Sequence, residues 1–328
     1  MRKKHSVKMN HKNMAIFIKD KRRPCKKSQD LLLTKRFFPF YMGKIKYVVN
    51  FVHGIYPKTS ILLIIKLLSL AIRKKVSPNA MAFYNKGIKR NFKVEESTFC
   101  TYTYGKGPLI LMLHGWCSNG ARWRVYVNAL VNSGYKVMVV DAPGHGTAPG
   151  RFLSIFLYAK GVKAILSSES NWHTVITHSI AGLTAMAAIG NSEQKYQPSK
   201  FIMMNTFSSA TAILEKFSSC LGISEKVVIG SKEKMSQYLD FPLTEFNIQK
   251  HYNQINTNGL LIYDTDDSVV PKTEAEHIIS TIKPLHVLKT DGLGHNLKCH
   301  TVVKAVLNFV ELDTKPKLEV DKTLCYTN

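Results

Sequence analysis

The sequence predicts an α/β fold with a mainly parallel sheet flanked by helices. Beyond residue 97, short apolar runs alternate with longer amphipathic runs, which is the pattern expected of βα units. Polar segments follow three of the apolar runs, at residues 177–182, 264–271 and 292–295. Because the carboxyl ends of parallel strands meet at one edge of a sheet, we expect these segments to lie together and to form the functional site.

The apolar runs predict strands at residues 99–104, 109–113, 136–140, 174–177, 200–204, 260–263 and 286–289. The amphipathic runs between them predict helices at residues 121–131, 152–167, 179–189, 273–282 and 297–310. Together these elements predict one catalytic domain over residues 97–312, followed by a C-terminal tail at 313–328.

One connection is too long for a simple crossover. About fifty residues separate the strand at 200–204 from the strand at 260–263. Helical patterns at 211–217 and 225–239 fall within this stretch. The sequence therefore predicts a small helical cap insertion at about 207–252, lying over the functional edge of the sheet.

The positive charge of the chain is concentrated at its beginning. The net charge is +24 over 328 residues; residues 1–96 carry 24 Lys/Arg against 4 Asp/Glu, and the remaining residues carry 22 against 18. Residues 1–96 are therefore interpreted as a basic N-terminal extension, of which residues 1–30 are expected to be disordered. The scattered lysines, the scarcity of aromatic residues in 1–30 and the absence of a recognition motif argue against a nucleic-acid partner.

Residues 61–72 form an apolar segment inside this extension. Lys66 interrupts it, and 12 residues are fewer than the roughly 20 needed to span a bilayer. One interpretation is an interfacial helix on an anionic membrane surface, because three basic residues follow at 73–75. The other is a helix packed against the catalytic domain, which we favour because an exposed apolar helix promotes aggregation.

The six cysteines show no CxxC pair and no regular spacing, so the sequence indicates neither a zinc site nor a disulfide framework. We expect a reducing, cytoplasmic location, with peripheral membrane association as the alternative. The sequence gives no indication of oligomeric state.

Ser179 is the candidate nucleophile. A serine nucleophile stands on a sharp, strained turn between a strand and a helix, with small residues two positions before and after it. Thr177 and Ala181 occupy those positions. An apolar strand precedes Ser179 and a helix of small residues follows it, and these flanking elements are what make the segment match such a turn.

The candidate base is His295. Four histidines follow the acidic segment, and His295 alone lies in a glycine-flanked loop after the last strand; the others are His277, His286 and His300.

Three aspartates in residues 264–267 are candidate acids. We prefer Asp267, because the turn should present the residue just ahead of the Val269-Val270-Pro271 step, and we expect Asp264 to brace the loop. Asp266 remains an alternative on sequence grounds.

A serine nucleophile also requires backbone N–H donors for the oxyanion. One donor is expected from Ile180, at the start of the helix that follows the nucleophile. The second is expected from Trp116, in the loop after the strand at 109–113.

Residues 99–312 resemble the α/β-hydrolase-fold serine hydrolases of the lipase, esterase and peptidase-like superfamily. The resemblance rests on an H-G-W turn at 114–116, a D-A-P-G-H-G stretch at 141–146, the turn at Ser179, a D-x-x-D-x-V-V-P acid turn and a G-L-G-H-N loop. It implies the α/β-hydrolase fold and hydrolysis through an acyl-enzyme, with no metal or organic cofactor.

The expected function is therefore a carboxylic-ester hydrolase acting on a small-molecule acyl substrate. The fold does not define the substrate further, because it also serves thioesters, amides and carbon–carbon bonds. The family pattern has glycine at the positions of Thr177 and Ala181. The alternative is accordingly a catalytically inactive α/β-hydrolase that serves as a binding or membrane-associated module.

Overall fold

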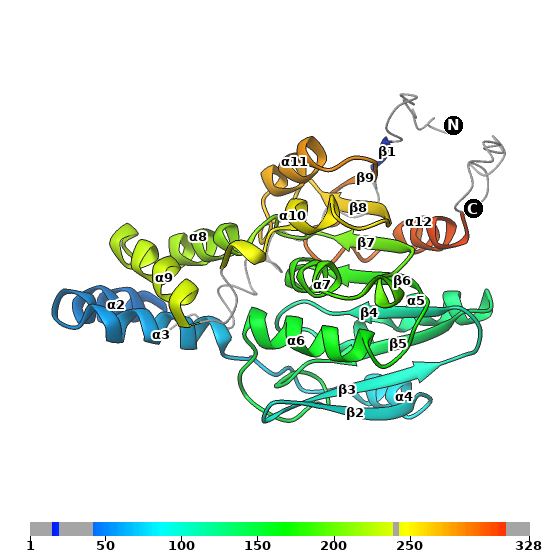
Figure 1. Ribbon diagram of the computed structural model, residues 1–328, viewed down its shortest axis with the longest axis horizontal. Coiled ribbons are helices and arrows are strands. Elements are labelled where there is room, and N and C mark those ends of the chain that lie inside the picture. The colour runs from blue at the N-terminus through cyan, green and yellow to red at the C-terminus, as the bar shows by residue number, and fades with distance from the viewer. Residues whose placement is uncertain (1–14, 20–41, 239–242, 313–328) are drawn as a thin grey trace.

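The computed structural model describes residues 15–19, 42–238 and 243–312. Within these residues, nine strands form one sheet in the order β1-β9-β8-β7-β6-β4-β5-β3-β2 (Figure 1). The strands are β1 (Ala15–Lys19), β2 (Ile88–Val94), β3 (Ser97–Tyr104), β4 (Leu109–Leu113), β5 (Lys136–Asp141), β6 (Trp172–His178), β7 (Lys200–Met204), β8 (Asn258–Asp264) and β9 (Leu285–Asp291).

The sheet is mainly parallel, as predicted. The strands from β1 to β5 in the sheet order pair in parallel, while β3 pairs antiparallel with β5 and β2 pairs antiparallel with β3. The parallel strands all end at the same edge of the sheet. The loops after β4, β6, β7, β8 and β9 consequently meet there.

Helices cover both faces of the sheet. The helices α6 (Ile155–Leu166), α7 (Ile180–Gly190), α10 (Ile248–Tyr252) and α11 (Lys272–Thr281) contribute to the core on one face, and α4 (Pro78–Tyr84), α5 (Arg124–Asn132) and α12 (His300–Glu311) to the core on the other. Strand β4 divides its side chains between the two cores, with Leu109, Leu111 and Leu113 on one face and Ile110 and Met112 on the other. The period-2 alternation of a strand buried on both faces explains this division.

The sheet extends beyond the predicted strands. Residues 15–19 form β1, which pairs in parallel with β9, so the expectation that residues 1–30 are disordered is wrong for this segment; the rest of 1–30 lies outside the described residues. Residues 88–94, which we expected to belong to the N-terminal extension, form β2. The reason is physical: β2 is an edge strand whose side chains are mostly exposed, and it therefore lacks the apolar run that marks a buried strand.

Three predicted helices begin later than expected. The helix predicted at 152–167 is α6, which begins at Ile155 after the N-cap Ser154. The helix predicted at 121–131 starts with a 3-10 turn at Gly120–Trp123, and α5 follows it. The helix predicted at 297–310 begins at His300, because Leu297 has a φ of 51°, which is incompatible with a right-handed helix.

Four helices form a group beyond the carboxyl ends of the parallel strands, which we call the helical cap (Figure 1). They are α8 (Ala210–Leu221) and α9 (Glu225–Tyr238) from the long insertion, and α2 (Met42–Ile55) and α3 (Pro57–Ser69) from the N-terminal region. The side chain of Asn50 donates to the carbonyl of Gly222 at 3.3 Å and accepts from the amide of Ser224 at 3.1 Å. The N-terminal helices are thus pinned to the turn between α8 and α9.

The apolar segment at 61–72 falls largely within α3. Ile61 and Ile64 are buried, and a β-carbon at Gly230 of α9 would lie 2.8 Å from Cδ1 of Ile61. This contact agrees with the packing interpretation of the segment. Of the helices that the structure describes, none combines the length and the apolar character needed to cross a membrane.

Ile64 and Leu62 offer a matched test of this packing, because both lie on α3 but differ in exposure, at 1% and 44%. Ile64→Ala should lower the free energy of unfolding by about 2–4 kcal/mol, since it leaves a cavity between α3 and its neighbours. Leu62→Ala should cost less than about 1 kcal/mol. The measurement is chemical denaturation of the full chain. Equal, small effects of both substitutions would contradict the packing of α3.

Candidate active site

Ser179 stands on a strained turn between β6 and α7. Its φ of 59° and ψ of −131° lie in a region that residues other than glycine rarely occupy. The amide of Ser179 donates to the carbonyl of Met204 at 2.9 Å, and its own carbonyl accepts from the hydroxyl of Thr206 at 2.9 Å. The end of β7 and the loop that follows it therefore hold both the amide and the carbonyl of Ser179.

Thr177 fits beneath the turn although the family pattern has glycine there. Its hydroxyl donates to the carbonyl of Ile202 at 2.9 Å, so that the polar end of the side chain is satisfied inside the sheet. The close approach falls instead at Gly182, where a β-carbon would lie 2.3 Å from Oγ1 of Thr206. Gly182 is thus a further small residue that this turn requires, next to the buried Ala181.

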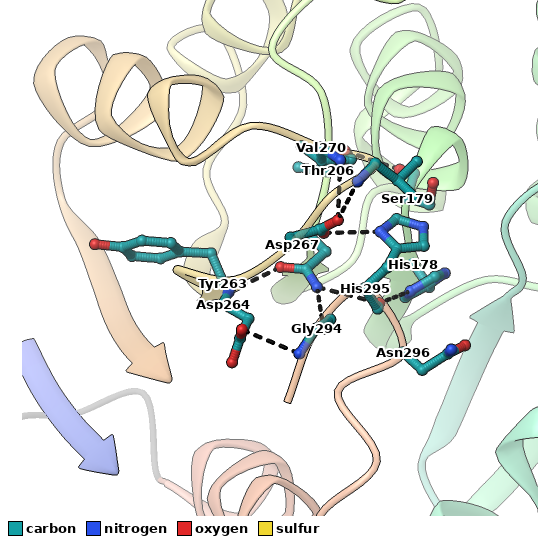
Figure 2. A network of polar contacts seen from close by, with 12 residues as sticks. His178, Ser179, Thr206, Tyr263, Asp264, Asp267, Val270, Gly294, His295 and Asn296 are labelled. Atoms are coloured by element: carbon teal, nitrogen blue, oxygen red, sulfur yellow. Dashed lines mark hydrogen bonds and ion pairs between the residues drawn. The ribbon is translucent and has the colours of Figure 1, made fainter. Parts of the chain in front are cut away.

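His295 lies in the loop after β9, beside Asp267 from the loop after β8. Its Nδ1 donates to Oδ2 of Asp267 at 2.7 Å, and the other carboxylate oxygen accepts from the amides of Val269 and Val270 at 2.8 and 3.0 Å. In Figure 2 the imidazole stands between the carboxylate of Asp267 and the side chain of Ser179. The structure thus brings the three predicted site residues to one edge of the sheet.

Asp264 occupies a different position. Its carboxylate accepts from the amide of Gly294 at 3.0 Å (Figure 2). It also accepts from the amide of Leu293 at 2.9 Å and from the hydroxyl of Thr290 at 2.7 Å. These contacts brace the loop that carries His295, as predicted. Asp266 is exposed, and only its backbone contacts the carboxylate of Asp264.

The other candidate histidines lie elsewhere. His277 is exposed on α11, His300 is exposed at the start of α12, and the ring of His286 packs against Phe309 with 5.4 Å between centroids. None of the three is in a loop at the carboxyl edge.

Asn205 joins the acid loop to the histidine loop, a role that the sequence analysis did not predict. Its side-chain amide donates to the carbonyls of Gly294 and His295, both at 3.1 Å, and its side-chain oxygen accepts from the amide of Asp264 at 3.0 Å. It is 2% exposed and has a φ of 45°. A polar residue directly after the predicted strand at 200–204 is the signal that could have identified it.

His178 and Arg122 also hold the histidine loop, and neither was predicted. Nε2 of His178 donates to the carbonyl of His295 at 2.7 Å, while its Nδ1 accepts from the guanidinium of Arg122. Arg122 donates in addition to the carbonyl of Asn296 at 3.3 Å. Burial and the nearby guanidinium keep the pKa of His178 well below its usual range, so that its imidazole is neutral.

The loop after β4 approaches the nucleophile closely. A β-carbon at Gly115 would lie 2.8 Å from Cβ of Ser179, so only glycine fits there. Trp116 follows in the same loop; its indole donates to the carbonyl of Leu70 at 3.3 Å and faces Phe217 of α8, with 6.5 Å between ring centroids. The predicted donor Ile180 is the first residue of α7, where a backbone amide has no acceptor within its own helix.

Buried polar contacts fix the H-G-W and D-A-P-G-H-G turns. Nε2 of His145 accepts from the amide of Cys117, and Nε2 of His114 accepts from the amide of Ala142, both at 3.2 Å. Burial lowers the pKa of His114 to about 4 and that of His145 to about 3, so both are neutral acceptors. Asp141 accepts from the amide of Gly120 at 2.6 Å. These turns position the loop that bears Trp116.

No protein-family model matches the chain. A 40% identical match over 85 residues, 25% of this chain, relates it to the pimeloyl-[acyl-carrier protein] methyl ester esterase of Aeromonas hydrophila subsp. hydrophila. The match spans about a third (32%) of the length of that relative.

Solved structures match over most of their length. Est1E from Butyrivibrio proteoclasticus, solved with ferulic acid, is 17% identical and superimposes with a TM-score of 0.55, covering 67% of this chain and 97% of Est1E. A membrane phospholipase A is 14% identical with a TM-score of 0.54, covering 84% of this chain and 98% of that structure. The chain therefore has the α/β-hydrolase fold.

The neutral, buried His145 predicts a pH dependence of stability. Because its pKa is about 3 when folded and near 6.5 when unfolded, the unfolded chain binds the extra proton. Its contribution is complete above about pH 6.5 and is lost as the pH falls toward the folded value. Between these two values the unfolding free energy of the unmodified protein should rise with pH partly because of His145. His145→Gln should therefore lower the increase in unfolding free energy per pH unit by about 1.4 kcal/mol below about pH 6.

The measurement is chemical denaturation at several pH values, with His277→Gln as control because His277 is exposed on α11. The control should keep the slope of the unmodified protein. A slope that His145→Gln leaves unchanged would refute the assignment of a neutral, buried imidazole.

Proposed function

We propose that this protein is a serine hydrolase that cleaves a carboxylic ester, or a related acyl bond, through Ser179, His295 and Asp267. The observation that carries the proposal is the hydrogen bond from His295 to Asp267 beside a serine on a strained strand-to-helix turn. The name of the esterase relative supports the same reaction class. The proposed substrate is a small-molecule acyl compound, with no cofactor.

In this mechanism Nε2 of His295 takes the proton of the Ser179 hydroxyl as its oxygen attacks the acyl carbon. Asp267 holds the imidazole in the tautomer that presents Nε2 to the serine and stabilises the imidazolium that forms. The amides of Trp116 and Ile180 donate to the oxyanion of the tetrahedral intermediate. The imidazolium then protonates the leaving alcohol, which departs as the carbonyl re-forms.

The second half of the reaction mirrors the first. His295 takes a proton from water, the resulting hydroxide equivalent attacks the acyl-enzyme, and collapse of the second intermediate releases the acid. Ser179 recovers its proton from the imidazolium. Each proton that leaves the serine or the water thus passes through one nitrogen of His295.

The alternative, an inactive hydrolase used as a binding module, rested on Thr177 and Ala181. Thr177 is satisfied by a hydrogen bond in the sheet, and the close contact lies at Gly182. These two observations support an active site over the alternative, because the substitution at Thr177 is accommodated beneath the turn. Location in the cytoplasm, with or without peripheral membrane contact, remains a proposal from the sequence.

We expect Ser179→Ala, Asp267→Asn and His295→Ala each to lower kcat by about 10⁴-fold or more while leaving the fold intact. The measurement is steady-state hydrolysis of a panel of esters of varied acyl chain length, with circular dichroism as the check on folding. A Ser179→Ala variant that retained full hydrolysis would exclude the mechanism. Absence of turnover on every ester by the unmodified protein would favour the binding module.

Asn205 provides a test of how the histidine loop is held. Asn205→Gly keeps the left-handed backbone conformation and removes all three side-chain hydrogen bonds. We expect kcat to fall by about 10²-fold, because His295 would shift relative to Ser179.

The matched control is Asn191→Ala, since the side chain of Asn191, the residue that follows α7, donates to the carbonyl of Ala187 in that helix. It should leave kcat within about twofold of the unmodified value. Equal rates for both variants would show that Asn205 does not position the imidazole.

A further inference from the structure

Helix α2 carries an exposed apolar and aromatic stripe. Tyr47, Val48, Phe51 and Ile55 are 69%, 52%, 70% and 54% exposed. At 100° per residue these four positions fall within about 100° of the helix circumference, so they form one continuous face. Tyr56, directly after the helix, is 66% exposed as well.

The stripe is not needed to hold α2 on the protein. Val49 is fully buried in the core, and Asn50 bonds the turn between α8 and α9. The helix is therefore anchored through another side, and the stripe is a surplus apolar surface. Exposed apolar surface that the fold does not use marks an interaction site.

Positive charge predominates in the helices of the cap. No aspartate or glutamate occurs between Asp30 and Glu95, while α2 contains Lys44 and Lys46 and α3 contains Lys58 and Lys66. The four helices of the cap together carry eight lysines against three glutamates, and one of those glutamates, Glu215, pairs with Lys232 at 2.7 Å. The four helices of the cap consequently carry a net positive charge.

We propose that the stripe on α2 docks the protein onto an anionic lipid surface. Apolar and aromatic side chains on one face of a helix, with lysines near them, insert at the boundary of headgroups and acyl chains. The tyrosines suit this boundary because each ring combines an apolar body with a polar hydroxyl. A second copy of the chain is the poorer occupant, since a symmetric contact would bring two basic surfaces together.

This docking surface differs from the one that the sequence suggested. The segment 61–72 buries Ile61 and Ile64 against the cap, whereas the exposed stripe lies one helix earlier, on α2. In Figure 1, α2 and α3 lie at the end of the molecule beyond the carboxyl edge of the sheet. Docking through α2 would thus turn the cap toward the lipid. The inference is independent of the proposed hydrolysis.

The test is sedimentation of the full-length protein with vesicles of phosphatidylcholine alone or with phosphatidylglycerol added. All samples carry Ser179→Ala, so that hydrolysis of lipid cannot alter the vesicles. The test variant is Phe51→Gln with Ile55→Gln. The matched control is Ile88→Gln with Val125→Gln, because Ile88 and Val125 are 77% and 51% exposed on β2 and α5, away from the cap.

We expect binding to the anionic vesicles, weakened by added salt, and a loss of affinity of about tenfold or more in the α2 variant but not in the control. Thermal unfolding should show that both variants are folded. Three results would overturn the proposal: no binding by the parent protein, equal binding by the α2 variant, or a dimer in lipid-free solution that the α2 variant abolishes. The last result would assign the stripe to a second copy.

Discussion

The backbone turn at Ser179 is the constraint on which the rest of the site depends. A left-handed φ at a serine costs roughly 1–3 kcal/mol and persists only when its surroundings over-determine it. Here the carbonyl of Met204 and the hydroxyl of Thr206 fix the turn, and the absence of a side chain at Gly182 leaves room for it. The turn sets where the hydroxyl stands, and the loops that carry His295, Asp267 and Trp116 must all come to that point.

Buried hydrogen bonds to its backbone hold the histidine loop at that point. Asp264 accepts two of its amides, whereas Asn205 and His178 donate to the carbonyl of His295. Because the backbone is held from several sides, the imidazole can keep its hydrogen bond to Asp267. Two aspartates three residues apart thus have separate roles, one shaping the loop and the other contacting the ring.

The sequence predicted those parts of the structure that leave a local pattern. Buried strands such as β4 and β7 appear as continuous apolar runs, and their bounds agree with the prediction. Ser179, Asp267 and His295 follow such strands, so their meeting could be predicted from strand order alone. Edge strand β2 was missed because its exposed side chains leave no apolar run.

Contacts between distant segments could not be predicted. Asn205, His178 and Arg122 act through backbone carbonyls and ring nitrogens that only the folded chain brings within reach. The pairing of α2 and α3 with α8 and α9 joins segments about 170 residues apart through Asn50 and Gly222, and nothing in either segment identifies the other. The exposed stripe on α2 could not be predicted either, because the sequence does not show that α2 packs through Val49 and so leaves its other apolar face exposed.

The most direct test of the central claim is covalent labelling of the full-length protein with a fluorophosphonate, followed by peptide mass spectrometry. Only a serine whose hydroxyl is activated by a neighbouring base reacts with such a probe. We expect one stoichiometric adduct on Ser179, lost in His295→Ala and strongly slowed in Asp267→Asn. No adduct on Ser179 of the folded, unmodified protein, or an adduct that forms equally fast without His295, would contradict it.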